Sequence, residues 1–334
     1  MRSLRRSAGV WIAALAWAQQ GPVAPAAAPA PPPAAWRGLI GEYGPRDSTR
    51  VMVLERDGRL LAHVDSTHEA VLRPTGAGRF GSALGTLRFR RDARGRATSL
   101  ALRGAIWPLR ALGPDEGAVF RIAPVRPIEE LRREALAATP PVESGEFRPS
   151  DLVELVTLDS TIKLDIRYAG SRNFLGTPLY TQARAFLQRP AAEALVRAHR
   201  KLAALGYGLL IHDGYRPWYV TKMFWDATPP AQHEFVADPA SGSRHNRGAA
   251  VDLTLYDRRT GAAVEMPGTY DEFSHRSYPG YPGGTSRQRW HRELLRRAME
   301  AEGFTVFSAE WWHFDFKDWK QYRIGTTPFE RLGR

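Results

Sequence analysis

The pattern of hydrophobic and polar positions divides the chain into two parts. Between residues 36 and 125, apolar and polar residues alternate over short stretches, and the pair Asp57-Gly58 separates two of them. A period of two indicates strands with one buried face, and Asp-Gly is a typical hairpin turn. A second hairpin is expected around residues 92–95, between strands at 86–89 and 97–102. The pattern therefore predicts a small all-β domain over 36–125, a meander curved into a half-barrel.

From residue 151 to residue 334 the pattern mixes two periods. Residues 190–205 place apolar side chains on one side of a helix, with Pro190 near its first turn and Gly206 after its end. Residues 286–302 form a second amphipathic segment, which stops before Gly303. Short apolar stretches that are typical of strands lie at 152–156, 162–168, 208–212 and 304–307. Strands and helices without strict alternation predict an α+β fold, in which helices flank a central antiparallel sheet.

The N-terminus has the features of a targeting segment. Three Arg residues within the first six precede an apolar run at 8–16, and residues 16–18 fit the small-x-small cleavage pattern. We expect a signal peptide over 1–18 and export to the periplasm or the cell envelope. The apolar run is too short to span about 30 Å of hydrocarbon, so no membrane span is expected. The Pro- and Ala-rich stretch 19–35 and the stretch 126–150 are expected to be linkers.

Composition narrows the partners and ligands. The stretch 36–125 holds fifteen Arg, no Lys and nine acidic residues, which is +6 of the formal net charge of +12. Such a surface can attract an anionic cell-wall polymer, although an ordinary solvated surface in an Arg-rich protein is the plainer interpretation and the one we favour. Because we expect the protein to be exported, we do not expect a nucleic-acid partner. The chain has no Cys, which excludes disulfides, cysteine nucleophiles and thiolate metal sites.

Two short segments of the second domain carry candidate chemistry. One runs from Ser243 to Asp252 and contains His245, and the other begins Glu310-Trp311-Trp312-His313. Two imidazoles and one carboxylate, from His245, Asp252 and His313, suit a tetrahedral zinc whose fourth position stays open for water. Glu310 is then the candidate base for that water. Its two Trp neighbours favour a buried setting, in which a Glu and a His need partners.

Four blocks of this domain, in order, carry a resemblance to a known family. They are Asp165-Ile166-Arg167-Tyr168-Ala169 with Asn173-Phe174, Asp213-Gly214-Tyr215-Arg216-Pro217, the run from Ser243 to Leu255, and Glu310-Trp311-Trp312-His313. Together they resemble the zinc D-alanyl-D-alanine dipeptidases, within a larger group that includes D-Ala-D-Ala carboxypeptidases and hedgehog-like domains. The all-β domain, from Gly41-Glu42-Tyr43 to Arg90-Arg91-Asp92, resembles the lipocalin-like β-domains of some exported serine hydrolases.

The resemblance to the dipeptidases implies a role for each matching residue. It implies one zinc ion held by His245, Asp252 and His313, with Glu310 as the catalytic base. It implies that Arg216 polarises the scissile carbonyl and stabilises the oxyanion. Ser243 matches a residue near the substrate carboxylate, and Asp271 matches one that receives the substrate ammonium. The implied substrate is therefore a small free dipeptide such as D-Ala-D-Ala.

Two departures from the family pattern leave the physiological substrate open. Arg244 and Asn246 flank His245 where the family has serines. The expected export also differs from the cytoplasmic location of the family members that confer antibiotic resistance. A D,D- or L,D-carboxypeptidase acting on peptidoglycan stem peptides is the nearest alternative, and a wall-binding module with a structural metal is a third. The other histidines, His275 among them, have no partner at a recognisable spacing. Since no proposed site residue lies in 36–125, dipeptide turnover is expected to survive its deletion.

Overall fold

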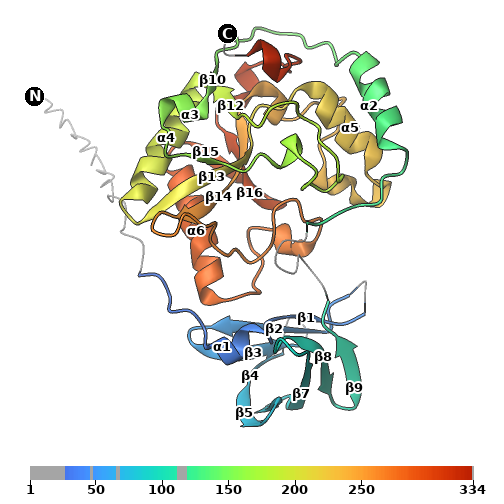
Figure 1. Cartoon of the computed structure of the whole chain (residues 1–334), viewed down its shortest axis with the longest axis vertical. Helices are drawn as coiled ribbons and strands as arrows, with labels where there is room; N and C mark the ends of the chain where they lie inside the picture. The colour runs from blue at the N-terminus through green and yellow to red at the C-terminus, as the bar shows by residue number, and fades with distance from the viewer. Residues whose placement is uncertain (1–26, 46–47, 65–67, 111–118, 333–334) are drawn as a thin grey trace, which may run out of the picture.

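The computed structural model describes residues 27–45, 48–64, 68–110 and 119–332. The expected signal peptide, residues 1–18, lies outside the described residues, as does the first part of the expected linker 19–35. The described chain forms a small β unit followed by a larger unit of helices and strands (Figure 1). Within the described residues, none of the helices combines the length and the apolar composition needed to cross a bilayer.

The first unit is built from two antiparallel sheets, preceded by the short helix α1 (Ala34–Arg37). One sheet has the order β1 (Gly41–Tyr43), β2 (Val51–Arg56), β3 (Arg59–His63), β4 (Glu69–Val71). The other has the order β5 (Arg73–Gly76), β6 (Arg79–Ser82), β7 (Gly85–Arg91), β8 (Ala97–Leu102), β9 (Ala105–Pro108). An isolated bridge between Tyr43 and Leu109 links them.

Both expected hairpins are present in this unit. The β2–β3 turn contains Asp57 and Gly58, both with positive φ, and β7 pairs with β8 across the turn that includes Gly95. Inward-facing apolar side chains of the two sheets share one core, which confirms an all-antiparallel β region. Its likeness to lipocalins stays a prediction.

The second unit is organised around a five-stranded sheet of order β11 (Lys163–Leu164), β13 (Tyr207–Asp213), β14 (Ala250–Asp257), β16 (Glu310–Phe316), β15 (Phe304–Phe307). Each neighbouring pair among β13, β14, β16 and β15 is antiparallel, as expected for the central sheet, whereas β11 pairs with β13 in parallel, so the sheet is mixed. The crossover from β11 to β13 contains helix α4 (Arg189–Ala203), which a parallel connection requires. A two-stranded sheet of β10 (Leu152–Glu154) and β12 (Phe186–Gln188) lies beside it.

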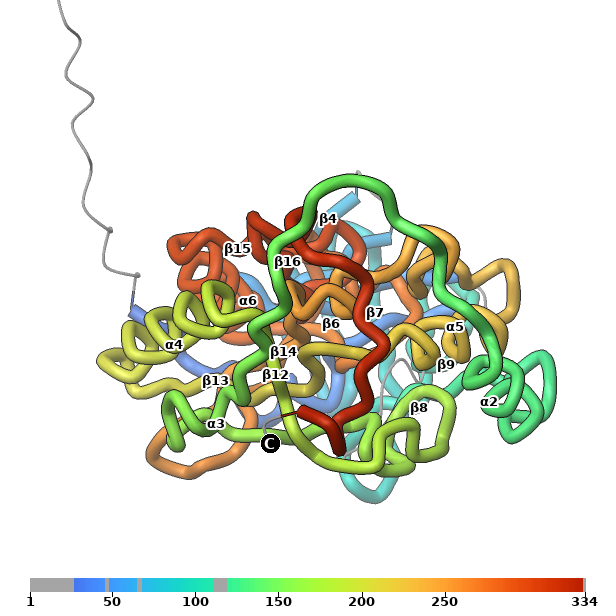
Figure 2. Tube along the Cα trace, turned by 90° about the horizontal axis from the view of Figure 1, so that it is seen from above, coloured from blue at the N-terminus to red at the C-terminus, as the bar shows by residue number. Residues whose placement is uncertain are grey.

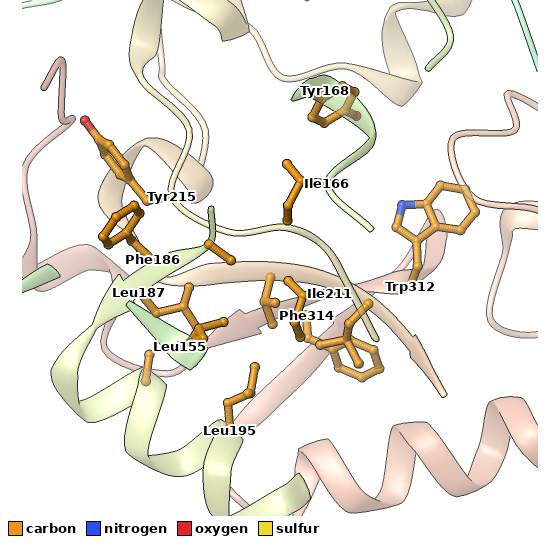
Figure 3. Packing of buried hydrophobic residues seen from close by; sticks show 14 of the residues in the cluster. Leu155, Ile166, Tyr168, Phe186, Leu187, Leu195, Ile211, Tyr215, Trp312 and Phe314 are labelled. Carbon is orange, nitrogen blue, oxygen red and sulfur yellow. The ribbon is translucent and has the colours of Figure 1, made fainter. Parts of the chain in front are cut away.

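Helices α4 and α6 (Ser286–Glu300) pack against the sheet, and α3 (Leu155–Leu158) lies next to α4. Leu195 of α4 points toward Ile211 and Phe314 of the sheet, whereas Tyr168 and Trp312 lie away from this helix layer (Figure 3). Helix α5 (Trp218–Ala227) packs with α2 (Ile128–Ala137). Short 3-10 segments complete the unit: Arg167–Ala169, Pro230–Phe235, His245–Arg247, His275–Ser277, Trp319–Gln321 and Phe329–Arg331. The α+β class is thus confirmed.

The stretch 126–150, expected to be a linker, is packed against the second unit. It contains α2, and beyond α2 it crosses the unit beside the C-terminal segment (Figure 2). The carboxylate of Glu143 contacts Arg247 at 2.6 Å and accepts a hydrogen bond from the backbone N–H of Ile324 at 2.7 Å. The segment therefore belongs physically to the unit that follows it.

Candidate active site

Two neighbouring strands and one tight turn bring three candidate metal ligands together. Asp252 on β14 lies directly opposite His313 on β16 in the strand register, so their side chains are neighbours. His245 begins the 3-10 turn that leads into β14. The turn ends at Gly248, which has φ of +66° and whose added Cβ would lie 2.4 Å from Leu152 Cδ2. Only glycine fits this position without strain, and it folds His245 back toward the sheet.

The three donor atoms form a triangle of the size that a tetrahedral zinc requires. His245 Nε2 lies 3.1 Å from His313 Nδ1, and Asp252 Oδ1 lies 3.3 Å and 3.1 Å from these two nitrogens. Ligands about 2.0 to 2.1 Å from a tetrahedral ion are separated by roughly 3.3 Å. Asp252 Oδ1 is buried without a hydrogen-bond partner, which is costly unless a cation binds it. The geometry and the donor set fit a metal ion.

Neighbouring groups orient both imidazoles for this role. His245 Nδ1 lies 2.7 Å from the carbonyl of Gly214, and His313 Nε2 lies 2.9 Å from Asp315 Oδ1. Each of these nitrogens can donate its proton outward, which leaves the lone pair of the other nitrogen facing the triangle. The remaining oxygen of Asp252 accepts from Tyr270 Oη at 3.1 Å. Burial would raise the pKa of Asp252, but the two imidazoles outweigh it and hold the carboxyl well below its usual range.

Glu310 stands beside the triangle without joining it. Its Oε2 lies 3.7 Å from His313 Nδ1, and the side chain lines the same cavity. Burial, followed by the charge of Asp252 and opposed by His313, raises the pKa of Glu310 to about 7. A carboxylate with such a pKa can accept and return a proton near neutrality.

Arg216 is a buried cation held in a fixed orientation. Its guanidinium contacts Asp213 through Nε at 2.9 Å and Nη2 at 2.8 Å, and Nη2 lies 3.7 Å from Asp252 Oδ2. It also lies over the ring of Phe224 at 4.6 Å. Arg216 is 7 % exposed and faces the cavity, so it is not a surface partner of Asp213 alone. Such a group can stabilise negative charge that develops beside it.

Asn246, one of the departures from the family pattern, connects two parts of the site. Its Nδ2 donates to the carbonyl of Arg216 and to Thr221 Oγ1, both at 2.8 Å, and its Oδ1 accepts from the N–H of Ser243 at 2.7 Å. The other departure, Arg244, pairs with Asp315 at 3.1 Å and is about one third exposed at the rim of the cavity. Both therefore support residues of the site without blocking it.

Asp271 presents an unpartnered carboxylate oxygen. Its Oδ1 accepts from Tyr168 Oη at 2.9 Å, whereas its Oδ2 is buried without a hydrogen-bond partner. Burial, and next the charge of Asp252, raises the pKa of Asp271 well above its usual range. The residue also has φ of +57°, in the left-handed region that few non-Gly residues adopt, although Asp tolerates it better than most. Such an arrangement is suited to a cationic group on a ligand.

All seven residues singled out from the sequence line one cavity of about 320 Å³: Arg216, Ser243, His245, Asp252, Asp271, Glu310 and His313. Ser243 contributes its hydroxyl, which accepts from the N–H of His245 at 3.2 Å. The sequence did not single out Phe307 and Trp319, which form part of the wall, or the supporting Asp315. A signal for Asp315 was present, since it lies two residues after His313 on the same strand.

Comparison with known proteins shows the family of the second unit. The family model described as D-Ala-D-Ala dipeptidase matches residues 148–326, which is more than half of the chain. The chain belongs to the D-Ala-D-Ala dipeptidase family. It is 35% identical to the D-alanyl-D-alanine dipeptidase of Escherichia coli (strain K12) over 180 residues, 54% of this chain and 92% of that protein.

Two further relatives are also D-alanyl-D-alanine dipeptidases. The dipeptidases of Enterococcus faecium and Streptomyces coelicolor are also 35% identical, over 175 and 199 residues, and 87% and 93% of their lengths are covered. A solved structure of the LdcB LD-carboxypeptidase shares 18% identity and a TM-score of 0.30, covering 55% of this chain and 72% of that chain, which is too distant to inform the fold. The family match begins at residue 148, so the β unit lies outside it.

Proposed function

We propose that this protein is an exported zinc peptidase that hydrolyses D-Ala-D-Ala, or a similar small dipeptide, during turnover of cell-wall peptides. The observation that carries the proposal is the single cavity in which a buried metal triad, a candidate base and the unpartnered Oδ2 of Asp271 meet. Relatives named D-alanyl-D-alanine dipeptidase support the substrate class. The signal-peptide pattern of residues 1–18 supports export.

The protein's own residues account for the steps of peptide hydrolysis. Zinc held by His245, Asp252 and His313 would supply a Lewis acid that lowers the pKa of water toward neutrality. Glu310 takes the proton from the attacking water and passes it to the departing amide nitrogen. Arg216, immobilised by Asp213, donates to the carbonyl oxygen as negative charge develops on it.

The ends of the cavity match the two ends of a free dipeptide. Asp271 offers a carboxylate oxygen for the substrate ammonium, and Ser243 lies where a hydroxyl can donate to the substrate carboxylate. A volume of about 320 Å³ is at the small end of ligand pockets and suits a small substrate. Recognition of both termini disfavours longer peptides. Because Asp271 is buried within the cavity, the dipeptidase is favoured over the carboxypeptidase.

The decisive experiment compares substrates with and without a free amine. We expect the purified protein to cleave D-Ala-D-Ala with a kcat/KM at least about tenfold above that for N-acetyl-D-Ala-D-Ala, since a charge-assisted hydrogen bond contributes about 1.5 to 3 kcal/mol. A stem pentapeptide and L-Ala-L-Ala complete the panel, and a chelator should stop all turnover. Equal or faster cleavage of the acetylated compound would favour the carboxypeptidase instead.

A further inference from the structure

The loop that carries Asp271 lies against the N-terminal β unit. This loop, residues 265–285, is the later part of the connection from β14 to α6 and reaches toward β1 and β2 (Figure 1). Two residues on neighbouring strands, Glu42 on β1 and Glu55 on β2, bond to the loop or to the start of α6 that follows it. Glu42 is 1 % exposed and Glu55 is 2 % exposed, so both are buried where the units meet.

Glu42 holds the middle of the loop. Its Oε1 contacts His275 Nε2 at 2.7 Å and accepts from Tyr281 Oη at 2.6 Å. Its Oε2 is held within the β unit by Thr49 and by Arg110, the latter at 3.2 Å. Burial alone would raise the pKa of Glu42, but the hydrogen bonds from His275, Thr49 and Tyr281 outweigh it and lower the pKa to about 2. Glu42 is therefore charged, and it bridges the two units.

Glu55 fixes the end of the loop at the start of α6. Its Oε2 accepts from the N–H of Ser286 at 2.8 Å, and its backbone N–H donates to the carbonyl of Gly284 at 3.0 Å. A carboxylate at a helix N-terminus satisfies free N–H groups and complements the helix dipole. The loop is thus held at its middle and at its end by the same sheet.

A short, densely bonded segment links the Glu42 contact to Asp271. The next residue, Glu272, is buried and accepts from Arg276 Nε at 2.7 Å, Ser274 Oγ at 2.6 Å and Thr269 Oγ1 at 3.0 Å. These bonds make residues 269–276 one compact turn, with Asp271 near one end and His275 near the other. Hydrogen-bonded residues of one turn therefore connect His275 to Asp271.

Asp271 needs such external support. It occupies the left-handed region with φ of +57°, and its Oδ2 faces the cavity without a protein partner. This conformation carries a cost for a residue with a side chain, although a smaller one for Asp than for most, so packing and hydrogen bonds from the surroundings help to hold it. Tyr168 supplies one hydrogen bond to Asp271. The remaining constraint comes from the turn that Glu42 anchors.

We propose that the β unit positions the substrate-ammonium site, and that Glu42 is the positioning residue through which it acts. This inference rests on the proposed function, in which Asp271 receives the free ammonium of a dipeptide. Selectivity for a free amine then depends on a residue that does not touch the substrate and belongs to the other unit. This proposal departs from the expectation, drawn from the sequence, that turnover of a free dipeptide is independent of 36–125.

The test uses the full-length protein with Glu42→Gln, which keeps the shape of the side chain and removes its charge. We expect the ratio of kcat/KM for D-Ala-D-Ala to that for N-acetyl-D-Ala-D-Ala to fall about threefold to tenfold, mainly through a higher KM for the free dipeptide. Metal content and cleavage of the acetylated compound should stay unchanged.

Glu69→Gln, which removes a carboxylate that bonds to Arg56 and His63 within the β unit, is the matched control and should leave the ratio unaltered. Tyr281→Phe, which removes one loop donor to Glu42, should shift the ratio in the same direction and is the second variant if Glu42→Gln does not fold.

A double-mutant cycle with Asp271→Asn separates the two proposals. If Glu42 acts through Asp271, Glu42→Gln should change the ratio little in the Asp271→Asn background, because coupled residues are not additive. An unchanged ratio in the folded single variants, or an equal loss on both substrates, would overturn the positioning role. If Asp271→Asn alone leaves the ratio intact, the proposed function fails first.

Discussion

Charge at the level of single residues explains what the cavity is built to bind. Several carboxylates lie in or beside it, among them those of Asp213, Asp252, Asp271 and Glu310, and Arg216 contacts two of these. Burial raises the pKa of Asp271 and of Glu310, which is the cost of holding excess negative charge away from water. A divalent metal ion at the triad and an ammonium at Asp271 would supply the missing positive charge. The residues thus favour a metal and a cationic substrate together.

The base can be tested without disturbing the metal ligands. Glu310→Gln keeps the side-chain volume but cannot accept a proton, so kcat/KM for D-Ala-D-Ala should fall by about 10² to 10⁴. Metal content, measured by elemental analysis, should match the unaltered protein because Glu310 lies outside the triad. Glu300→Gln on α6, whose partner is Arg296, is the matched control and should keep full activity. Near-normal turnover of the Glu310 variant would assign the base to another group.

Asp315 should matter for metal affinity. Its Oδ1 accepts from His313 Nε2 at 2.9 Å, which fixes the imidazole and increases its basicity as a ligand. We expect Asp315→Asn to weaken zinc binding about tenfold to a hundredfold in a competition with a fluorescent chelator. The control is Asp318→Asn, three residues further along the chain, which removes an ion pair with Arg148. This variant should bind zinc normally. Equal affinity in both variants would show that His313 needs no such partner.

Among single residues, those with local motifs were predictable and those with distant partners were not. Six of the seven cavity residues stand in the four short blocks named above, and only Asp271 lies outside them. His275 has no recognisable neighbour because its partner, Glu42, lies 233 positions away. Glu42 itself appears as one more polar residue in a strand. A long-range pair leaves no spacing to read in a single sequence.

At the scale of elements, periodicity located the long amphipathic helices but not the short or buried elements. The segments expected at 190–205 and 286–302 correspond to α4 and α6. Helix α5 was not expected because it is buried on several sides and lacks a polar stripe. The apolar stretches at 152–156 and 162–168 each contain only a short strand, followed by a helical turn. Buried turns and strands of this length have the same apolar pattern.

The link between β1 and the loop predicts a specific acid sensitivity. The pKa of Glu42 is about 2 in the folded protein and about 4.5 when unfolded, so its stabilising effect is complete above pH 4.5. That effect is lost as the pH falls from about 4.5 toward 2, and it amounts to on the order of 3 kcal/mol. In urea titrations, the free energy of unfolding of Glu42→Gln should therefore fall less steeply over this range. Parallel curves for the variant and the unaltered protein would contradict the assignment.

At the scale of the whole molecule, two connections tie the β unit to the dipeptidase unit. The first connection is the segment that follows the β unit, which is bonded to the dipeptidase unit. The N–H of Val125 donates to the carbonyl of Ala227, and Glu143 contacts Arg247. Glu42 and Glu55 add buried bonds from the sheet to the loop and to α6. Buried polar contacts of this kind are costly to break singly, because each leaves an unpaired group. The two units should therefore unfold as one cooperative body.

Metal removal tests this coupling. A metal that binds only the folded protein raises its stability by mass action, so a chelator should lower the Tm by several degrees. Because the loop beside the metal site is bonded to the β unit, calorimetry should show one transition before and after chelation, and the whole transition should shift. The double variant Glu42→Gln, Glu55→Gln weakens the bonds between the two units. Calorimetry of this variant should therefore show two separate transitions. Only the transition of the dipeptidase unit should shift when a chelator is added. Glu69→Gln, whose carboxylate pairs with Arg56 and His63 within the β unit, should retain the single transition. Two transitions already present in the unaltered protein would mean that the β unit folds independently of the site it contacts.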